Sequence, residues 1–145
     1  MGNTTHVQLT SLQQDLTFTA ESSSGRQVMV DISKEAGGNG NGTSPMELVL
    51  EALGGCTGMD ILSILKKKRT PFSHLSIRIE GKKRDEHPKS YTDIHLRFVL
   101  HSDGGEKALR DLLHAAELSH EKYCSVAHML KPAVSITFDA EIADE

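Results

Sequence analysis

The sequence has no tryptophan, and only 4% of its residues are aromatic. Proteins that stack nucleic acid bases or sugar rings build the platform from such side chains, so we expect no platform of that kind. An excess of positive charge is also missing, because the formal net charge at pH 7 is -4. This balance gives no reason to expect a nucleic acid partner, and a small-molecule substrate fits better.

A secretory signal is missing as well. Residues 1–15 have neither a basic start nor a continuous apolar core, so we expect the protein to stay in the cytoplasm. Thiols are kept reduced there, and the two cysteines are more often catalytic, redox-sensing or simply buried than joined in a permanent bridge. The length suits a single domain over residues 1–145, with residues 1–15 as a polar leader or a short edge strand.

Alternating apolar and polar residues predict a hairpin near the N-terminus. The two segments are LTFTA at residues 16–20 and VMVDI at residues 28–32, separated by a turn rich in serine. Residues 36–43, AGGNGNGT, then have the composition of a flexible loop without an apolar anchor.

A helix start follows this loop. Ser44 is a suitable N-cap, Pro45 a suitable first helical residue, and Glu47 completes a capping box with Ser44. The apolar run over residues 48–65 leads into four basic residues, which complement the helix dipole, and Pro71 stops the helix.

The predicted helix is apolar nearly all round, which is typical of a helix central in a core or within a membrane. Glu51 and Asp60 lie inside the run and alternating strands flank it, which argues against a lone transmembrane span. We interpret it as a buried central helix and expect no membrane partner. Three glycines grouped within it suggest close approach of another backbone: Gly54, Gly55 and Gly58.

The second half of the chain repeats the strand pattern. Residues 75–79 and 94–100 alternate and are expected to pair, residues 106–118 have helical spacing, a short helix is expected near 125–130, and residues 134–140 form a last strand. The order is β-β-α-β-β-α-α-β, which predicts an α+β domain without an internal repeat.

The two cysteines are the residues most able to do chemistry. Cys56 has small neighbours that let a ligand approach its sulfur, and Cys124 lies at the junction of two predicted helices, where exposed amide groups favour a thiolate. An inert core thiol is a reasonable alternative for each. Together they suggest a cycle: one thiolate attacks a peroxide and becomes a sulfenic acid, and the other condenses with it to a disulfide.

Three charged residues are weaker candidates. Asp60 lies one turn after Cys56 and could accept a hydrogen bond near the thiol, or pair with a basic residue. Arg26, at the start of the second hairpin strand, could lower a thiol pKa, or could simply be solvated. Glu47 has a sufficient role in the capping box, and a catalytic role for it needs an irregular first turn of the helix.

A metal site is the less favoured interpretation of the histidines. His120, Cys124 and His128 are spaced at i, i+4 and i+8, which would line one face of an unbroken helix and resembles part of a transition-metal site. A helix break is expected among them, and eight histidines make such spacing a common coincidence. We predict no metal and no cofactor.

Two cysteine motifs occur in a definite order. The first is SPMEL at residues 44–48 followed by ALGGCT at residues 52–57, and the second is EKYCSVA at residues 121–127. Both resemble the cysteine segments of the OsmC/Ohr superfamily, the osmotically inducible and organic-hydroperoxide-resistance proteins. The resemblance extends over nearly the whole chain.

The resemblance implies an α+β fold in an intertwined homodimer, with two central helices back to back and active sites built from both subunits. The grouped glycines agree with that helix contact. It also implies that Cys56 is the peroxidatic thiol and Cys124 the resolving thiol. The favoured substrates would be organic hydroperoxides, and the reductant a dithiol such as a lipoylated protein.

The chain departs from the Ohr pattern at one point. In Ohr proteins the residue directly after the proline is the acid that pairs with the catalytic arginine, whereas here Met46 stands there and the acid follows as Glu47. Arg26 is the best local candidate for the arginine. These details resemble a less characterised OsmC-like subgroup.

The two cysteine motifs are compatible with two functions. The leading one is a thiol-dependent peroxidase that acts in oxidative stress defence through both cysteines. The alternative is a non-catalytic thiol sensor or small-molecule-binding protein that uses the same pocket. Sulfurs close together beside a water-accessible pocket would favour the enzyme, and sealed or distant thiols the alternative.

Overall fold

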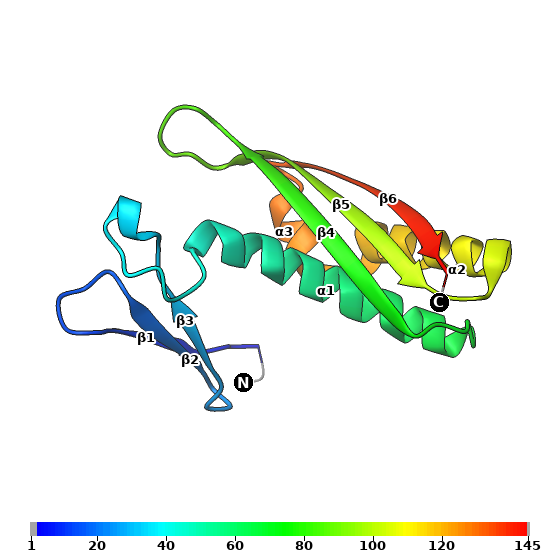
Figure 1. The fold of residues 1–145 in the computed structure, drawn as a ribbon, viewed down its shortest axis with the longest axis horizontal. Coiled ribbons are helices and arrows are strands. Elements are labelled where there is room, and N and C mark those ends of the chain that lie inside the picture. Colours follow the sequence, from blue (N-terminus) through cyan, green and yellow to red (C-terminus); the bar gives the residue numbers. More distant parts are fainter. Residues whose placement is uncertain (1–2, 145) are drawn as a thin grey trace. The chain divides into compact units, whose positions relative to one another are not determined.

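The computed structural model describes residues 3–144, and the chain divides into a first compact unit that ends at Val49 and a second that begins at Leu50 (Figure 1). The secondary structure is α+β, as the sequence predicts. The expectation of a single domain over residues 1–145 stays a prediction, and each unit is described by itself.

The first unit is a three-stranded antiparallel sheet of β1 (Val7–Ser11), β2 (Phe18–Ser22) and β3 (Gln27–Val30). The expected hairpin is confirmed as β2 and β3, with Gly25 at a positive φ of 84° in its turn. Strand β1 adds to the expected element order and pairs with β2. Within the N-terminal segment, residues 7–11 thus form an edge strand of this sheet.

One face of this sheet is apolar and open to solvent in the single chain. The register places Leu9 beside Ala20, and Ala20 beside Val28, on the same face. Val7 keeps 65% of its surface exposed, Leu9 48% and Val28 49%. Apolar side chains gathered in this way mark a surface that another surface can cover.

Asp31 organises the loop that follows β3. Its carboxylate is buried and accepts hydrogen bonds from the backbone N–H groups of Ile32, Asn39 and Asn41. Burial alone would raise the pKa of Asp31, but these N–H groups hold the pKa below its ordinary value. The glycine-rich segment therefore has a polar anchor, whereas its composition had indicated a flexible loop.

Helix α1 (Pro45–Lys67) begins with the predicted capping box. Ser44 Oγ accepts from the N–H of Glu47 at 3.2 Å, and Glu47 Oε1 accepts from the N–H of Ser44 at 3.1 Å. The basic Lys66 and Lys67 occupy the last turn, where they complement the helix dipole.

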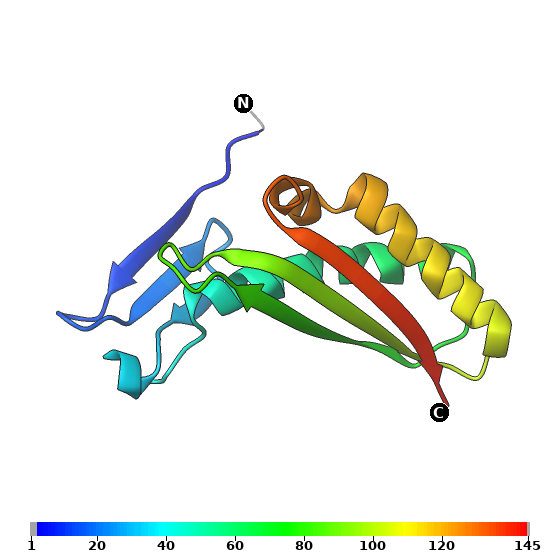
Figure 2. The same ribbon diagram turned by 90° about the horizontal axis from the view of Figure 1, so that it is seen from above.

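The second unit is a mixed three-stranded sheet with helices on one face (Figures 1 and 2). Strands β4 (His74–Lys83) and β5 (Tyr91–His101) pair antiparallel, as predicted, and β6 (Ser135–Ala143) pairs parallel to β5. Between β5 and β6 lie α2 (Gly105–Leu118) and α3 (Ser125–Leu130). A π-helical turn over Ser119–Tyr123, which the sequence indicated only as a helix break, joins the two helices.

The core of this unit lies between the sheet and the helices. Alternate residues of β5 point inward and are almost fully buried, among them Ile94, Phe98 and Leu100. They share the core with Ile61 of α1 and Leu112 of α2, both at 0% exposure. The apolar side chains that alternate along β5 and those at helical spacing in α2 therefore point into the same core.

The expected role of the grouped glycines is only partly right. A Cβ atom on Gly54 would lie 2.4 Å from Ile79 Cδ1, and one on Gly58 would lie 2.9 Å from Ile77 Cδ1. These two glycines therefore let β4 of the same chain approach α1, and not a partner helix. Gly55 has no atom within 4 Å of such a Cβ and faces open space.

Helix α1 is buried along one side and exposed along the other. Met59, for example, keeps 74% of its surface exposed. Among the described residues, α1 is the one helix long and apolar enough to cross a bilayer, with a mean hydropathy of 1.6 over an 18-residue stretch. Core helices share this property, so length and composition do not assign α1 to a membrane.

Candidate functional site

Cys56 lies midway along α1, between the side that faces the sheet and the open side at Gly55. The residue is half-buried in the single chain, so it is not sealed in the core. The sequence predicted that small neighbours leave room beside the Cys56 sulfur, and Gly55 is such a neighbour.

Cys124 lies directly after the π-helical turn and is the N-cap of α3. Its sulfur accepts a hydrogen bond from the N–H of Ala127 at 3.3 Å, and its own N–H donates to the carbonyl of Ser119 at 2.8 Å. The residue is only 3% exposed. The predicted position at a helix junction is confirmed, in a deeply buried setting.

The fold brings the two thiols near one another. Both cysteines are free, and Cys56 is near enough to Cys124 to affect the ionisation of its thiol. Burial, and next to it the hydrogen bond and charge of Cys56, raise the pKa of Cys124 from 9.0 to about 11, against the opposing N–H groups of Ala127 and Val126. The expectation that amide groups favour a Cys124 thiolate is therefore wrong, because burial outweighs them.

The difference in burial divides the roles of the two sulfurs. At neutral pH Cys124 keeps its proton, and a buried neutral thiol is a poor nucleophile. The half-exposed Cys56 is then the sulfur that an incoming oxidant can meet first. The order of roles that the motifs suggested agrees with this asymmetry of burial.

A short polar network beside the thiols was not foreseen. Ser119 Oγ donates to Asp60 Oδ2 at 2.8 Å and lies 2.7 Å from Thr57 Oγ1. Asp60 therefore accepts a hydrogen bond from Ser119, and it is in none of the ion pairs found among residues 3–144. The one available signal in the sequence was the presence of hydroxyl groups on otherwise apolar helix faces.

A cavity of about 300 Å³ adjoins the second cysteine. Cys124, His120, Tyr123, Met129 and Lys131 are among the residues that line it. Burial lowers the pKa of His120, and the nearby Lys131 lowers it further. A space of this size beside Cys124 can admit a small organic molecule.

The histidines near Cys124 do not form a metal site. His120 packs edge-on against Phe138, with ring centroids 5.8 Å apart. Within the described part of the chain, no group of three or more histidine, cysteine, aspartate or glutamate side chains could hold a metal ion. The π-helical turn ends at Cys124, so His120, Cys124 and His128 do not lie along one face of an unbroken helix.

The two charged candidates belong to the first unit. Arg26 is exposed in the turn before β3, where its carbonyl accepts from the N–H of Ser22 at 2.9 Å. Glu47 performs its capping role at the start of α1. The catalytic roles considered for Arg26 and Glu47 stay predictions.

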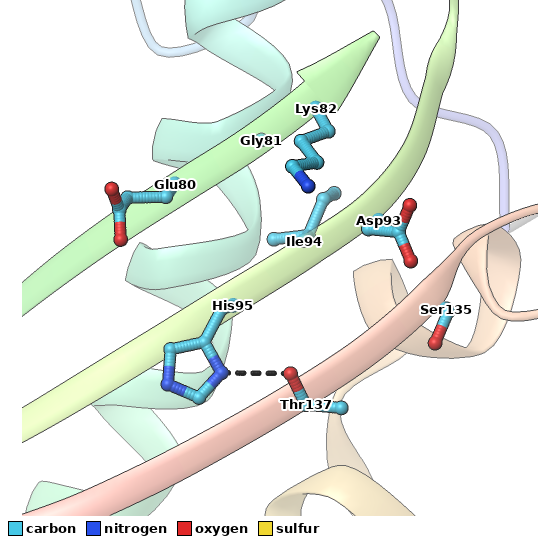
Figure 3. A pocket seen from close by; sticks show the side chains of 8 residues that line it. All are labelled: Glu80, Gly81, Lys82, Asp93, Ile94, His95, Ser135 and Thr137. Atoms are coloured by element: carbon cyan, nitrogen blue, oxygen red, sulfur yellow. Dashed lines mark hydrogen bonds between the residues drawn. The ribbon is translucent and has the colours of Figure 1, made fainter. Parts of the chain in front are cut away.

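A second hollow, of about 410 Å³, lies over the sheet face opposite the helices (Figure 3). Its rim carries both signs of charge, from Glu80, Lys82 and Asp93, beside His95 and Thr137. No cysteine lines it. The hollow is a solvated sheet surface and not part of the thiol site.

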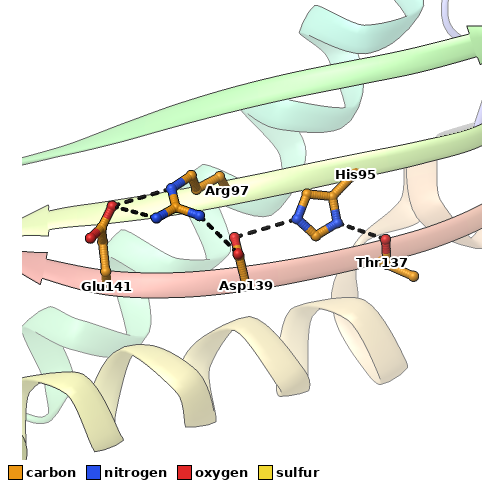
Figure 4. Close-up of polar contacts among 5 residues, drawn as sticks. All are labelled: His95, Arg97, Thr137, Asp139 and Glu141. Atoms are coloured by element: carbon orange, nitrogen blue, oxygen red, sulfur yellow. Dashed lines mark hydrogen bonds and ion pairs between the residues drawn. The ribbon is translucent and has the colours of Figure 1, made fainter.

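Next to this hollow, side chains of β5 and β6 form an exposed polar ladder (Figure 4). Arg97 pairs with Asp139 and with Glu141 at 2.9 Å each, and His95 Nδ1 lies 2.7 Å from Thr137 Oγ1. Exposed pairs of this kind add little stability. They explain why the parallel register of β5 and β6 tolerates so much charge.

Comparison with known proteins identifies the family of this chain. The chain belongs to the family of OsmC-like proteins, whose sequence model matches residues 38–139. It is 40% identical to Protein YhfA of Escherichia coli K12 over 130 residues, which are 89% of this chain and 92% of that protein.

Solved structures agree with this assignment. A hypothetical protein of Aquifex aeolicus VF5 superposes with a TM-score of 0.82 at 36% identity, over 99% of this chain and 98% of that one. An organic hydroperoxide resistance protein of Legionella pneumophila has the same fold, with a TM-score of 0.67 at 15% identity, over 97% and 98% of the two chains. The OsmC/Ohr fold that the motifs implied is confirmed.

Proposed function

We propose that the protein is a cysteine-based peroxidase that reduces organic hydroperoxides, and to a lesser extent hydrogen peroxide, in oxidative stress defence. The observation that supports this most is that a half-buried thiol, Cys56, and a buried thiol, Cys124, lie near enough for one to affect the ionisation of the other. An inert core cysteine has no need of a second thiol beside it.

The first step is an attack of the Cys56 thiolate on the outer oxygen of the hydroperoxide. The O–O bond breaks, a hydroxyl group is transferred to sulfur, and the alkoxide leaves and takes a proton to become an alcohol. Cysteine is oxidised by two electrons and the hydroperoxide is reduced by the same two. The protonated Cys124 is a hydrogen-bond donor to the Cys56 sulfur at this stage.

The second step closes a disulfide. Cys124 sulfur attacks the sulfur of the Cys56 sulfenic acid, an S–S bond forms, the S–O bond breaks, and the Cys124 proton leaves with the hydroxide as water. Conversion of the Cys56 thiolate to a neutral sulfenic acid also removes the like charge that raised the Cys124 pKa. The second thiol thus becomes more reactive once the first has reacted.

The cycle needs an external reductant. A dithiol such as a lipoylated protein attacks the disulfide, forms a mixed disulfide and then closes its own ring, which returns both cysteines as thiols. This restores the starting state with one hydroperoxide and one dithiol consumed. A cytoplasmic location, which remains a prediction, fits a need for reduced dithiols.

A homodimer is part of the proposal. The exposed side of α1 with Gly55 and Met59, and the apolar face of the first sheet, are surfaces that a second copy could cover. In that assembly Arg26 is the candidate to hold the thiolate of Cys56 from the other side of the site, and Glu47 is the candidate acid to pair with that arginine. Charge-assisted contact with an arginine would favour the thiolate.

Turnover with a dithiol tests the proposal. Cys56→Ser should abolish reduction of an organic hydroperoxide, because a hydroxyl supplies no nucleophile comparable to a thiolate at neutral pH. Cys124→Ser should allow one oxidation of Cys56 and then accumulate sulfinic acid under excess peroxide. Consumption of hydroperoxide by Cys56→Ser at the wild-type rate would refute the assignment.

A thiol sensor is the second candidate, and one observation favours it. Burial of Cys124 to 3% exposure limits access of a reductant to that sulfur. A sensor would form the disulfide with peroxide, but would not turn over with a dithiol. The same assay separates the two functions, since the sensor consumes about one equivalent of hydroperoxide and stops.

A further inference from the structure

Ser119 is a polar side chain at 0% exposure in the apolar interior of the second unit. Its hydroxyl proton goes to Asp60 Oδ2, so the hydroxyl of Thr57 is the donor in the contact between Thr57 and Ser119. The order of donation is therefore Thr57 to Ser119 to Asp60. Both partners belong to α1, the helix that carries Cys56.

The same serine also holds the second cysteine. Its carbonyl accepts the N–H of Cys124 at 2.8 Å, across the five-residue span of the π-helical turn. One residue therefore joins the two halves of the site: its side chain fixes it to α1 beside Cys56, and its backbone fixes Cys124.

The π-helical turn determines which way Cys124 faces. Such turns are rare and insert one residue relative to a regular α-helix. Without the insertion, Cys124, the residue that ends the turn, would lie about 100° away around the helix axis. The direction in which Cys124 faces, and with it its nearness to Cys56, thus depends on the turn that begins at Ser119.

We infer that Ser119, held by Thr57 and Asp60, is a positioning residue that keeps Cys124 within reach of oxidised Cys56, so that the disulfide closes faster than a second peroxide attacks. The advantage of fast disulfide closure rests on the proposed function. The nearness of the two sulfurs, on which the role depends, can be measured without peroxide.

The closure itself is tested first with a glutathione redox buffer. Oxidised glutathione takes two electrons from the thiols of Cys56 and Cys124, which form the disulfide, and leaves as two reduced glutathione molecules. Ser119→Ala and Thr57→Val should each lower the equilibrium constant for this disulfide by about tenfold, the factor expected for loss of a buried hydrogen bond. Thr57→Ser keeps the hydroxyl and should restore the wild-type value.

The peroxide arm then follows the kinetic consequence. In Ser119→Ala, oxidation of Cys56 should keep the wild-type rate while disulfide closure slows by about tenfold, so the yield of sulfinic acid per turnover rises. A merely structural loss would lower both rates together. The matched control is Ser102→Ala, because Ser102 is another buried serine with two hydrogen bonds, to Pro71 and Gly104, and neither touches the thiols.

The outcomes are distinct. Wild-type disulfide constants in both Ser119→Ala and Thr57→Val, with folding intact by circular dichroism, would overturn the positioning role. A tenfold loss in the glutathione arm for Thr57→Val with rescue by Thr57→Ser supports it even if Ser119→Ala fails to fold. No oxidation of wild-type Cys56 by organic hydroperoxide would instead overturn the proposed function, and leave the glutathione result to decide the positioning role.

Discussion

Substitutions at Gly55 separate the properties of the single chain from those of an assembly. No atom lies within 4 Å of a Cβ built on this residue, so alanine fits without a clash in the single chain. Alanine is more favourable than glycine inside a helix by about 1 kcal/mol. For a chain of this size, that gain raises the midpoint of thermal unfolding by about 2–4 °C if nothing packs against Gly55.

Gly55→Leu gives the sharper result. In a lone chain its side chain extends into solvent, and because leucine has nearly the helix propensity of alanine, stability rises by a similar amount. In a dimer with a partner helix against Gly55, leucine overfills the contact at a cost of about 1–3 kcal/mol. The dimer then dissociates at a higher protein concentration than the wild type, and peroxidase activity falls with it. Gly54→Ala is the matched control, because its Cβ meets Ile79 of the same chain at 2.4 Å.

Sedimentation velocity and thermal unfolding at several protein concentrations measure both effects. The dimer predicts a wild-type midpoint that depends on concentration, and a Gly55→Leu protein that sediments more slowly than Gly54→Ala. A wild type that sediments as a monomer at micromolar concentration with full activity would refute the reasoning.

Two predictions concern pH. Since the unfolded Cys124 thiol ionises near 9.0 and the folded one at about 11, stability should fall as pH rises through this range, and denaturant midpoints of Cys124→Ser should lack that loss. The hydroxyl of Thr70 donates to Asp111 at 2.7 Å and is the main cause that lowers the Asp111 pKa. Thr70→Val should therefore cost about 2 kcal/mol at neutral pH, and the difference from wild type should shrink on acidification as the carboxylate takes up a proton.

The sequence predicted helices and strands well where the hydrophobic periodicity agrees with the capping and turn residues at the ends of the segment. The capping box of Ser44 and Glu47 and the alternation in β5 each specify one structure locally, and both are confirmed. Strand β1 was only an alternative, because all five of its residues are exposed in the chain and two apolar positions give a weak period. Local pattern does not reveal a strand whose support comes from pairing.

The site was harder to predict because it depends on contacts between distant segments. The sequence identified both cysteines and their helices, but could not show that burial would raise the Cys124 pKa. Nor could it show that Gly54 faces β4, since the rotation of α1 over the sheet is set by packing. The role of Ser119 could not be predicted, because its contacts with α1 depend on the π-helical turn.

The central claim is that Cys56 and Cys124 reduce a hydroperoxide together. The most direct measurement mixes the reduced wild-type protein with one equivalent of an organic hydroperoxide, without reductant, and follows alcohol release and peptide masses in the same sample. The account predicts one alcohol released for each Cys56–Cys124 disulfide formed, and renewed alcohol release once a dithiol is added. Hydroperoxide that remains intact while both thiols stay free would contradict it.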